Sequence, residues 1–169
     1  MSSYDEVLNA KQEACKKELN EYPCKKIMKI KIPSINKKML KKYGANKIEL
    51  KKEKLYSDEA SRYSVVIPVK KKGSELLEGL SPKDFGGLIT EFKDGEITFF
   101  IETNSENQRS EQVINQKKNK QLMKIKDFIS DLNKKIESHN ATVQKIAAFT
   151  VKKRKKNCED EKRIAKKSG

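Results

Sequence analysis

Hydrophobic residues recur at helical spacing in two segments of the chain. The first lies between residues 4 and 21 and ends before Pro23, and its apolar face holds Tyr4, Val7, Leu8, Cys15 and Leu19. The second runs from about residue 105 to 138, with apolar positions three and four residues apart at Leu122, Ile125, Ile129, Leu132 and Ile136. Because this repeat covers only two heptads, we expect a helix that packs on a sheet rather than the seam of a coiled-coil dimer.

Alternation of hydrophobic and polar positions predicts strands elsewhere. Residues 25–32 (KKIMKIKI) place Met28, Ile30 and Ile32 on one side of a strand and the lysines on the other. Residues 88–92 and 96–102 form a hairpin around the turn Lys93-Asp94-Gly95. Further strands are expected at residues 47–56, 62–70 and 142–151, and short helices at 36–43 and 74–80.

These elements together predict an α+β fold. A mainly antiparallel sheet of five or six strands packs against the N-terminal helix and the one long helix of the C-terminal half. The strand order also fits an OB-like barrel with added helices, which is the minor alternative. We assign residues 1–151 to a single α+β domain. Residues 152–169 lack apolar periodicity, so they are expected to form a basic, flexible tail.

Basic and acidic residues are segregated along the chain, and this pattern says more about function than any sequence motif does. The 169 residues include 39 Lys and Arg against 24 Asp and Glu, a net charge of +15. Residues 23–72 hold 16 basic and four acidic side chains, and residues 113–169 hold 17 and six, whereas residues 73–112 hold three and nine. Such blocks are typical of a chain that binds a polyanion. An AT-rich genome explains why 35 of the basic residues are Lys, but it does not explain the segregation.

The cysteines and the hydropathy bear on the compartment. Cys15, Cys24 and Cys158 are odd in number and contain no C-x-x-C pair, which indicates neither a disulfide framework nor a zinc site. With no run of about 18 apolar residues, we expect no membrane association. The expected localisation is cytoplasmic, or nuclear in a eukaryote, because KKRKK at 152–156 resembles a nuclear import signal.

Catalytic patterns are weak in this sequence. His139 is the only histidine, and we expect it to be a cap or surface residue at the end of the long helix. The protein is therefore predicted to be non-enzymatic, with no catalytic residue, metal or cofactor. A weaker alternative is a metal-dependent nuclease that uses carboxylates around the hairpin, although a solvated hairpin face is the favoured interpretation: Asp84, Glu91, Asp94, Glu96 and Glu102.

The leading hypothesis is binding of nucleic acid, DNA or RNA, through its backbone phosphates. Lysine is a point-charge contact, so little sequence specificity is expected. The candidate binding residues are Lys29, Lys31, Lys37, Lys38, Lys41, Lys42, Tyr43, Lys70, Lys71, Lys72, Lys152, Lys153, Arg154, Lys155 and Lys156.

Protein interaction is the alternative function. Blocks of opposite charge in one chain permit docking on an acidic protein partner, or self-association of the chain. The sequence leaves open whether the protein is a monomer or a homodimer.

Overall fold

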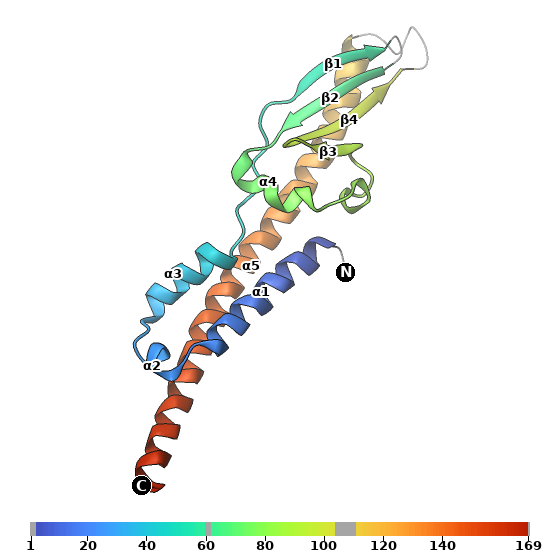
Figure 1. Cartoon of the computed structure of the whole chain (residues 1–169). Helices are drawn as coiled ribbons and strands as arrows, with labels where there is room; N and C mark the ends of the chain where they lie inside the picture. The colour runs from blue at the N-terminus through green and yellow to red at the C-terminus, as the bar shows by residue number, and fades with distance from the viewer. Residues whose placement is uncertain (1–2, 60–61, 104–110, 169) are drawn as a thin grey trace. The chain divides into compact units, whose positions relative to one another are not determined.

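A computed structural model describes residues 3–59, 62–103 and 111–168. Its elements are shown in Figure 1 and are, in chain order, α1 (Ser3–Glu21), α2 (Cys24–Ile27), α3 (Ile32–Tyr43), β1 (Lys54–Glu59), β2 (Arg62–Pro68), α4 (Lys71–Glu78), the 3-10 helix η1 (Pro82–Phe85), β3 (Glu91–Lys93), β4 (Glu96–Glu102) and α5 (Glu111–Ser168). They form two compact units. The sheet unit comprises Met1–Tyr4 and Asn46–Lys135, and the helical unit comprises Asp5–Ala45 and Ile136–Gly169. Helix α5 contributes its first part to one unit and its second part to the other.

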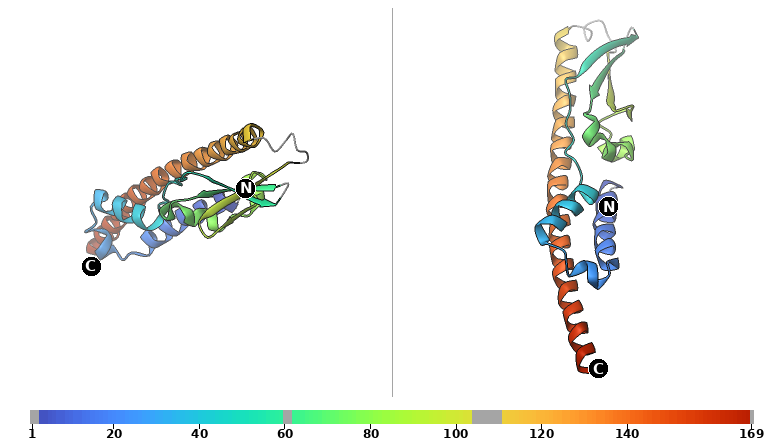
Figure 2. Two further views of the ribbon diagram at one scale, coloured as in Figure 1. Left: turned by 90° about the horizontal axis from the view of Figure 1, so that it is seen from above. Right: turned by 60° about the vertical axis from the view of Figure 1, so that its left-hand side comes forward.

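The sheet unit contains one antiparallel sheet of four strands in the order β1-β2-β4-β3. Central strands β2 and β4 pair Val65 with Phe99 and Ile67 with Ile97, and all four side chains are buried. The first part of α5 runs alongside this sheet (Figure 2). The centroid of the Phe128 ring of α5 lies 5.2 Å from the centroid of the Phe85 ring. The core of this unit therefore lies between the sheet, η1 and α5.

The helical unit is built from α1, α2, α3 and the second part of α5. Its core consists of Cys15, Leu19, Ile27, Ile35, Met39, Val143, Ala147, Val151 and Cys158. Three of these α5 residues are four positions apart, which places them on one face of the helix. That face receives α1 and α3, and the apolar contacts fix the position of the α2–α3 segment.

Polar side chains of α5 hold the chain between α3 and β1. In the helical unit Asn140 bonds both the backbone N–H and the carbonyl of Ala45, and in the sheet unit Asn133 does the same for Ile48. His139 is 2% exposed, and its Nε2 lies 2.8 Å from the carbonyl oxygen of Tyr43. These amides and the imidazole satisfy backbone groups that have no ladder or helix partner. The expectation that His139 is a cap or surface residue is therefore wrong.

The α+β class and several elements are confirmed. Helices α1, α3 and α4 and strand β2 form at the expected places, and the hairpin forms as β3 and β4. Its turn has Asp94 at φ 54° and Gly95 at φ 75°, the left-handed conformation that a tight hairpin turn requires.

Two of the predicted strands do not form, and a third has different bounds. Residues 25–32 form α2 and the connection to α3 instead of a strand, because Cys24, Ile27 and Ile30 also match helical spacing and pack on the helical core. Residues 142–151 continue α5. Strand β1 begins only at Lys54, although Leu50 makes an isolated bridge with Val69.

The long helix packs in the sheet unit as predicted, whereas neither the N-terminal helix on the sheet nor the OB-like barrel is found among the described residues. With β1 and β3 at the two ends of the four-stranded order, the described strands form an open sheet rather than an OB-like barrel. The N-terminal helix, from Asp5 onward, packs on α3 and α5 in the helical unit. It is the first part of α5 that packs in the sheet unit. Residues 105–110 of the predicted long helix lie outside the described residues.

The C-terminal residues and the cysteines also differ from expectation. Residues 152–168 are helical as the last part of α5. Cys24 and Cys158 form a disulfide between residues 134 positions apart, with Cα atoms 5.7 Å apart, whereas Cys15 is free and buried. The sequence indicated no disulfide because this pairing depends on α5 returning beside α2, which no local spacing reveals. Among the described helices, none has a stretch apolar and long enough to cross a membrane.

Candidate polyanion-binding hollow

The positive charge is concentrated in one of the two units. The helical unit has 21 basic and nine acidic residues, a net charge of +12, whereas the sheet unit has 18 and 15, a net charge of +3. The sequence blocks had suggested two basic regions along the chain. Folding combines residues 25–42 with residues 145–167 in a single unit, because α5 passes beside α1 and α3.

A hollow of about 290 Å³ lies on this basic unit, between the end of α1, the α2–α3 connection and the start of α3. We call it the lysine-rimmed hollow, and its lining residues are Tyr22, Lys26, Lys29, Ile30, Lys31, Ser34, Ile35 and Lys38. Four lysine residues thus line one concave surface. No carboxylate lines it, so the hollow offers a phosphate group four cationic neighbours.

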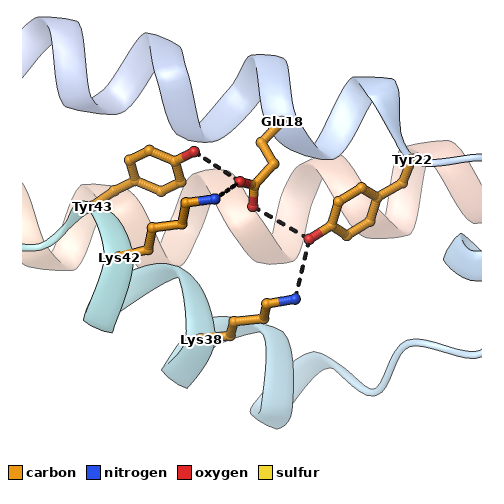
Figure 3. A network of polar contacts seen from close by, with 5 residues as sticks. All are labelled: Glu18, Tyr22, Lys38, Lys42 and Tyr43. Atoms are coloured by element: carbon orange, nitrogen blue, oxygen red, sulfur yellow. Dashed lines mark hydrogen bonds and ion pairs between the residues drawn. The ribbon is translucent and has the colours of Figure 1, made fainter.

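A hydrogen-bond network fixes Tyr22, which forms one wall of the hollow (Figure 3). Its hydroxyl donates to Glu18 Oε2 at 3.3 Å and accepts from Lys38 Nζ at 3.4 Å. The ammonium groups of Lys26 and Lys38 lie 3.9 Å and 5.8 Å from the centre of the Tyr22 ring. These cation–π contacts hold two of the four lysines beside the same ring.

Glu18 is the centre of this network. Its carboxylate accepts hydrogen bonds from Lys42, from the Tyr43 hydroxyl at 3.0 Å and from Tyr22. Partial burial alone raises the pKa of Glu18, but the bonds from Lys42, Tyr43 and Tyr22 outweigh it and hold the pKa below its usual range. The carboxylate therefore stays ionised at neutral pH and keeps Tyr22 and Lys42 in place.

Three of the candidate binding residues, Lys29, Lys31 and Lys38, line the hollow. Lys37 and Lys41 lie exposed on α3. Lys42 and Tyr43 are at the end of α3, where both bond Glu18, and the Tyr43 ring packs against the helical core. The structure therefore brings one of the four α3 lysines, Lys38, together with the α2–α3 connection, and it gives Lys42 and Tyr43 a structural partner in Glu18.

The basic run at residues 152–156 is divided between two kinds of environment. The Arg154 guanidinium donates to the carbonyls of Leu19, Asn20 and Tyr22 at the end of α1, at 3.0, 3.2 and 2.7 Å. Lys155 donates to the carbonyl of Ile30, a lining residue of the hollow. Lys152, Lys153 and Lys156 are exposed. The α5 run thus begins directly beside the hollow, with two members turned inward.

The remaining candidates, Lys70, Lys71 and Lys72, lie at the start of α4 in the sheet unit. Lys70 pairs with Glu49 at 2.6 Å, and this hydrogen bond lowers the pKa of the Glu49 carboxyl. Lys70 and Lys72, but not Lys71, border a separate hollow of about 250 Å³ with Asn46, Lys47, Glu49 and Gly73. The glutamate in this hollow reduces its attraction for an anion.

Two residues of the lysine-rimmed hollow were missed by sequence reasoning. Neither Lys26 nor Tyr22 was among the candidate binding residues, and Lys26 lies in a predicted strand that does not form. The signal that was available is the pair of prolines, Pro23 and Pro33, which bracket the α2–α3 connection and argue against a continuous strand.

Two carboxylates of the acidic segment have positions in local turns. Asp84 caps η1 through Ser81, and Asp94 lies in the β3–β4 turn. Within residues 3–59, 62–103 and 111–168, no three His, Cys, Asp or Glu side chains gather closely enough to hold a metal ion.

Comparison with known proteins gives no match: no protein-family model fits the sequence, and no curated protein or solved structure is significantly similar to it.

Proposed function

We propose that the protein binds nucleic acid through backbone phosphates, with the lysine-rimmed hollow as the centre of the binding surface. The observation that carries this proposal is the gathering of Lys26, Lys29, Lys31 and Lys38 around one concave surface of a unit with net charge +12. A phosphodiester chain presents a negative charge at each nucleotide, so adjacent phosphates match adjacent ammonium groups.

The surroundings of the hollow extend the phosphate path. Lys155 contacts the Ile30 carbonyl, and exposed lysines lie on the same helices as Lys155 and the rim residue Lys38: Lys152, Lys153 and Lys156 on α5, and Lys37 and Lys41 on α3. The contacts are point charges with no planar donor pair among them, because Arg154 is occupied by the carbonyls of α1. Binding is therefore expected to depend steeply on salt and weakly on sequence.

The test is the affinity for labelled single-stranded and duplex oligonucleotides of DNA and RNA, measured by fluorescence anisotropy at several salt concentrations. The triple variant Lys26→Gln, Lys29→Gln, Lys38→Gln should weaken binding and lower the slope of log affinity against log salt by about three. The matched control removes three exposed lysines of the sheet unit, Lys51, Lys52 and Lys54. It should leave the slope nearly unchanged.

Equal losses of affinity in both variants would mean that total charge, and not the hollow, governs binding. No binding at low salt would refute the proposal.

A second candidate is docking of an acidic protein segment, which the apolar floor of the hollow favours. Ile30 and Ile35 lie between the lysines, so an apolar side chain flanked by carboxylates fits there as well as a phosphate does. Light scattering and competition separate the two. An acidic peptide that displaces the oligonucleotide poorly favours nucleic acid, whereas tight peptide binding, or a salt-insensitive dimer without oligonucleotide binding, favours protein interaction.

A further inference from the structure

The disulfide joins the short helix α2 to the last part of α5. Cys24 is the first residue of α2, and Cys158 lies in the helical core. On the same stretch of α5, Arg154 and Lys155 bond the carbonyls of Tyr22 and Ile30, at the two ends of the α2 segment. Residues 22–30 are therefore fastened to α5 at three points, and the disulfide is the only covalent one.

Helix α2 is held in place by its attachments and not by its own length. It contains four residues, its N-cap Pro23 makes no side-chain capping bond, and Ile27 is its one buried side chain. A helix of this length is unstable by itself in water, so its conformation depends on its attachments. Without the covalent attachment, the segment is held by the apolar contacts of Ile27 and Ile30 with the helical core and by the two cationic contacts of α5.

The α2 segment also forms half of the lysine-rimmed hollow. Lys26, Lys29, Ile30 and Lys31 come from residues 24–31, whereas the other lining residues belong to α1 and α3. The Lys26 ammonium lies over the Tyr22 ring only two residues from Cys24. Displacement of α2 would therefore separate two of the hollow's walls and spread the lysines apart.

We propose that the Cys24–Cys158 disulfide is a reversible redox clamp that holds the wall of the lysine-rimmed hollow in place, so that reduction loosens the hollow and weakens polyanion binding. The clamp is a property of the helical unit itself, whereas its effect on binding rests on the function proposed above.

The chemistry is a two-electron exchange with a dithiol reductant. One thiolate of the reductant attacks Cys24 Sγ, which is partly exposed, and the S–S bond breaks with Cys158 Sγ leaving as a thiolate. The second thiolate of the reductant then attacks its own sulfur in the mixed disulfide and releases Cys24. Two protons convert the two cysteine thiolates to thiols, and the reductant leaves as a disulfide. Attack on Cys158 is disfavoured because this residue is only 6% exposed.

Two neighbouring groups define the reduced state. A carboxylate oxygen of Glu161 lies 3.9 Å from Cys24 Sγ and can accept a hydrogen bond from the released thiol. Cys15, in the same core, does not compete for either sulfur, because burial and the Glu18 charge raise the pKa of its thiol to about 11.

The experiment compares the full-length protein with and without dithiothreitol, by hydrogen exchange of the free protein and by oligonucleotide anisotropy. Reduction should speed exchange in residues 22–31 about tenfold and leave β2 and β4 unchanged. It should also weaken binding by at least about fivefold. The variant Cys24→Ser is the control, and it should behave as the reduced protein with no further response to dithiothreitol.

The outcomes separate the clamp from the proposed function. Faster exchange with weaker binding supports both. Faster exchange in a protein that binds no oligonucleotide in either state supports the clamp and refutes the proposed function. Unchanged exchange overturns the clamp whether or not binding is seen, and faster exchange with unaltered affinity overturns the link between the clamp and the binding surface.

Discussion

The two units share one helix but are stabilised in different ways. The sheet unit has a net charge of only +3, and a ladder of seven residue pairs between β2 and β4 forms its centre. The helical unit carries a net charge of +12. Besides its apolar core it contains a disulfide, the Arg154 guanidinium bonded to three carbonyls, and the Glu18 carboxylate bonded to three donors.

The difference follows from the concentration of like charge. Cationic side chains gathered in one unit repel each other and oppose compaction, and this cost grows with net charge. Apolar burial must then be supplemented by polar and covalent links. The helical unit therefore combines apolar burial with polar and covalent links, whereas the sheet unit is held by its strand ladder and its apolar core.

Substitution in the two cores should give the largest effect and tests whether the units are independent. Leu19→Ala removes a fully buried side chain of the helical core, and Ile97→Ala removes one from the sheet. Each should lower the free energy of unfolding by about 2–5 kcal/mol, from lost burial and the cavity left behind. Hydrogen exchange should increase in α1 and α3 for the first variant and in β2 and β4 for the second. Equal acceleration in both units for either variant would show one cooperative unit and remove the basis of the comparison.

The next largest effect on stability is expected from Arg154, which bonds backbone carbonyls, and not from its neighbour Lys153, which is exposed. Arg154→Met should destabilise the helical unit by about 1.5–3 kcal/mol, because it leaves three carbonyls at the end of α1 without their charged donor. Lys153→Met is the matched control, since Lys153 is exposed, and it should change stability by less than about 0.5 kcal/mol. Urea unfolding measures both. Similar losses would mean that Arg154 contributes only its charge.

The elements that sequence predicted correctly are those whose pattern is set by local rules. The hairpin depends on Asp94-Gly95, two residues that accept a left-handed backbone, and α1 depends on one apolar face and a following proline. Both signals lie within a few residues of the structure they produce.

The length of α5 was missed because its buried face is interrupted by polar residues. The apolar positions continue from Ile136 to Val143, Ala147, Val151 and Cys158, at steps of four and seven. Between Ile136 and Val143, however, His139 and Asn140 fall on the buried side, and such residues resemble a helix end. They are tolerated because the α3–β1 connection supplies their partners, the backbone groups of Tyr43 and Ala45.

The site could be predicted only in part for a similar reason. Lysine enrichment is visible in the sequence, and Lys29, Lys31 and Lys38 were found from it. The inward position of Arg154 and the disulfide depend on contacts across more than 130 residues, which periodicity does not reveal. Charge composition therefore predicted the region of the hollow but not which cations are free to bind.

The smallest effect is expected from pH, and it should be confined to the helical unit, because this unit contains the chain's only histidine. Burial lowers the pKa of His139 below its usual 6.5, the hydrogen bond to the Tyr43 carbonyl opposes this, and the charge of Lys11 adds to it. The neutral ring bonds Tyr43 through Nε2–H and accepts from the Gln12 amide at Nδ1, 3.0 Å away.

Between pH 6.5 and the lower folded-state pKa, the unfolded chain takes up a proton that the folded chain does not, so the stability of the helical unit should fall as pH decreases from 7.5 to 5. The Glu18 carboxyl, whose pKa is lowered from 4.5, contributes its own loss only at more acidic pH, so the two windows are separable. Hydrogen exchange at pH 7.5, 6 and 5, corrected for the intrinsic rate, should show the loss in α1 and α3 but not in β2 and β4. His139→Gln should abolish this dependence. If the His139→Gln variant keeps the pH dependence of stability, or if the sheet unit loses stability equally, a group other than His139 controls that dependence. The buried imidazole then does not distinguish the two units.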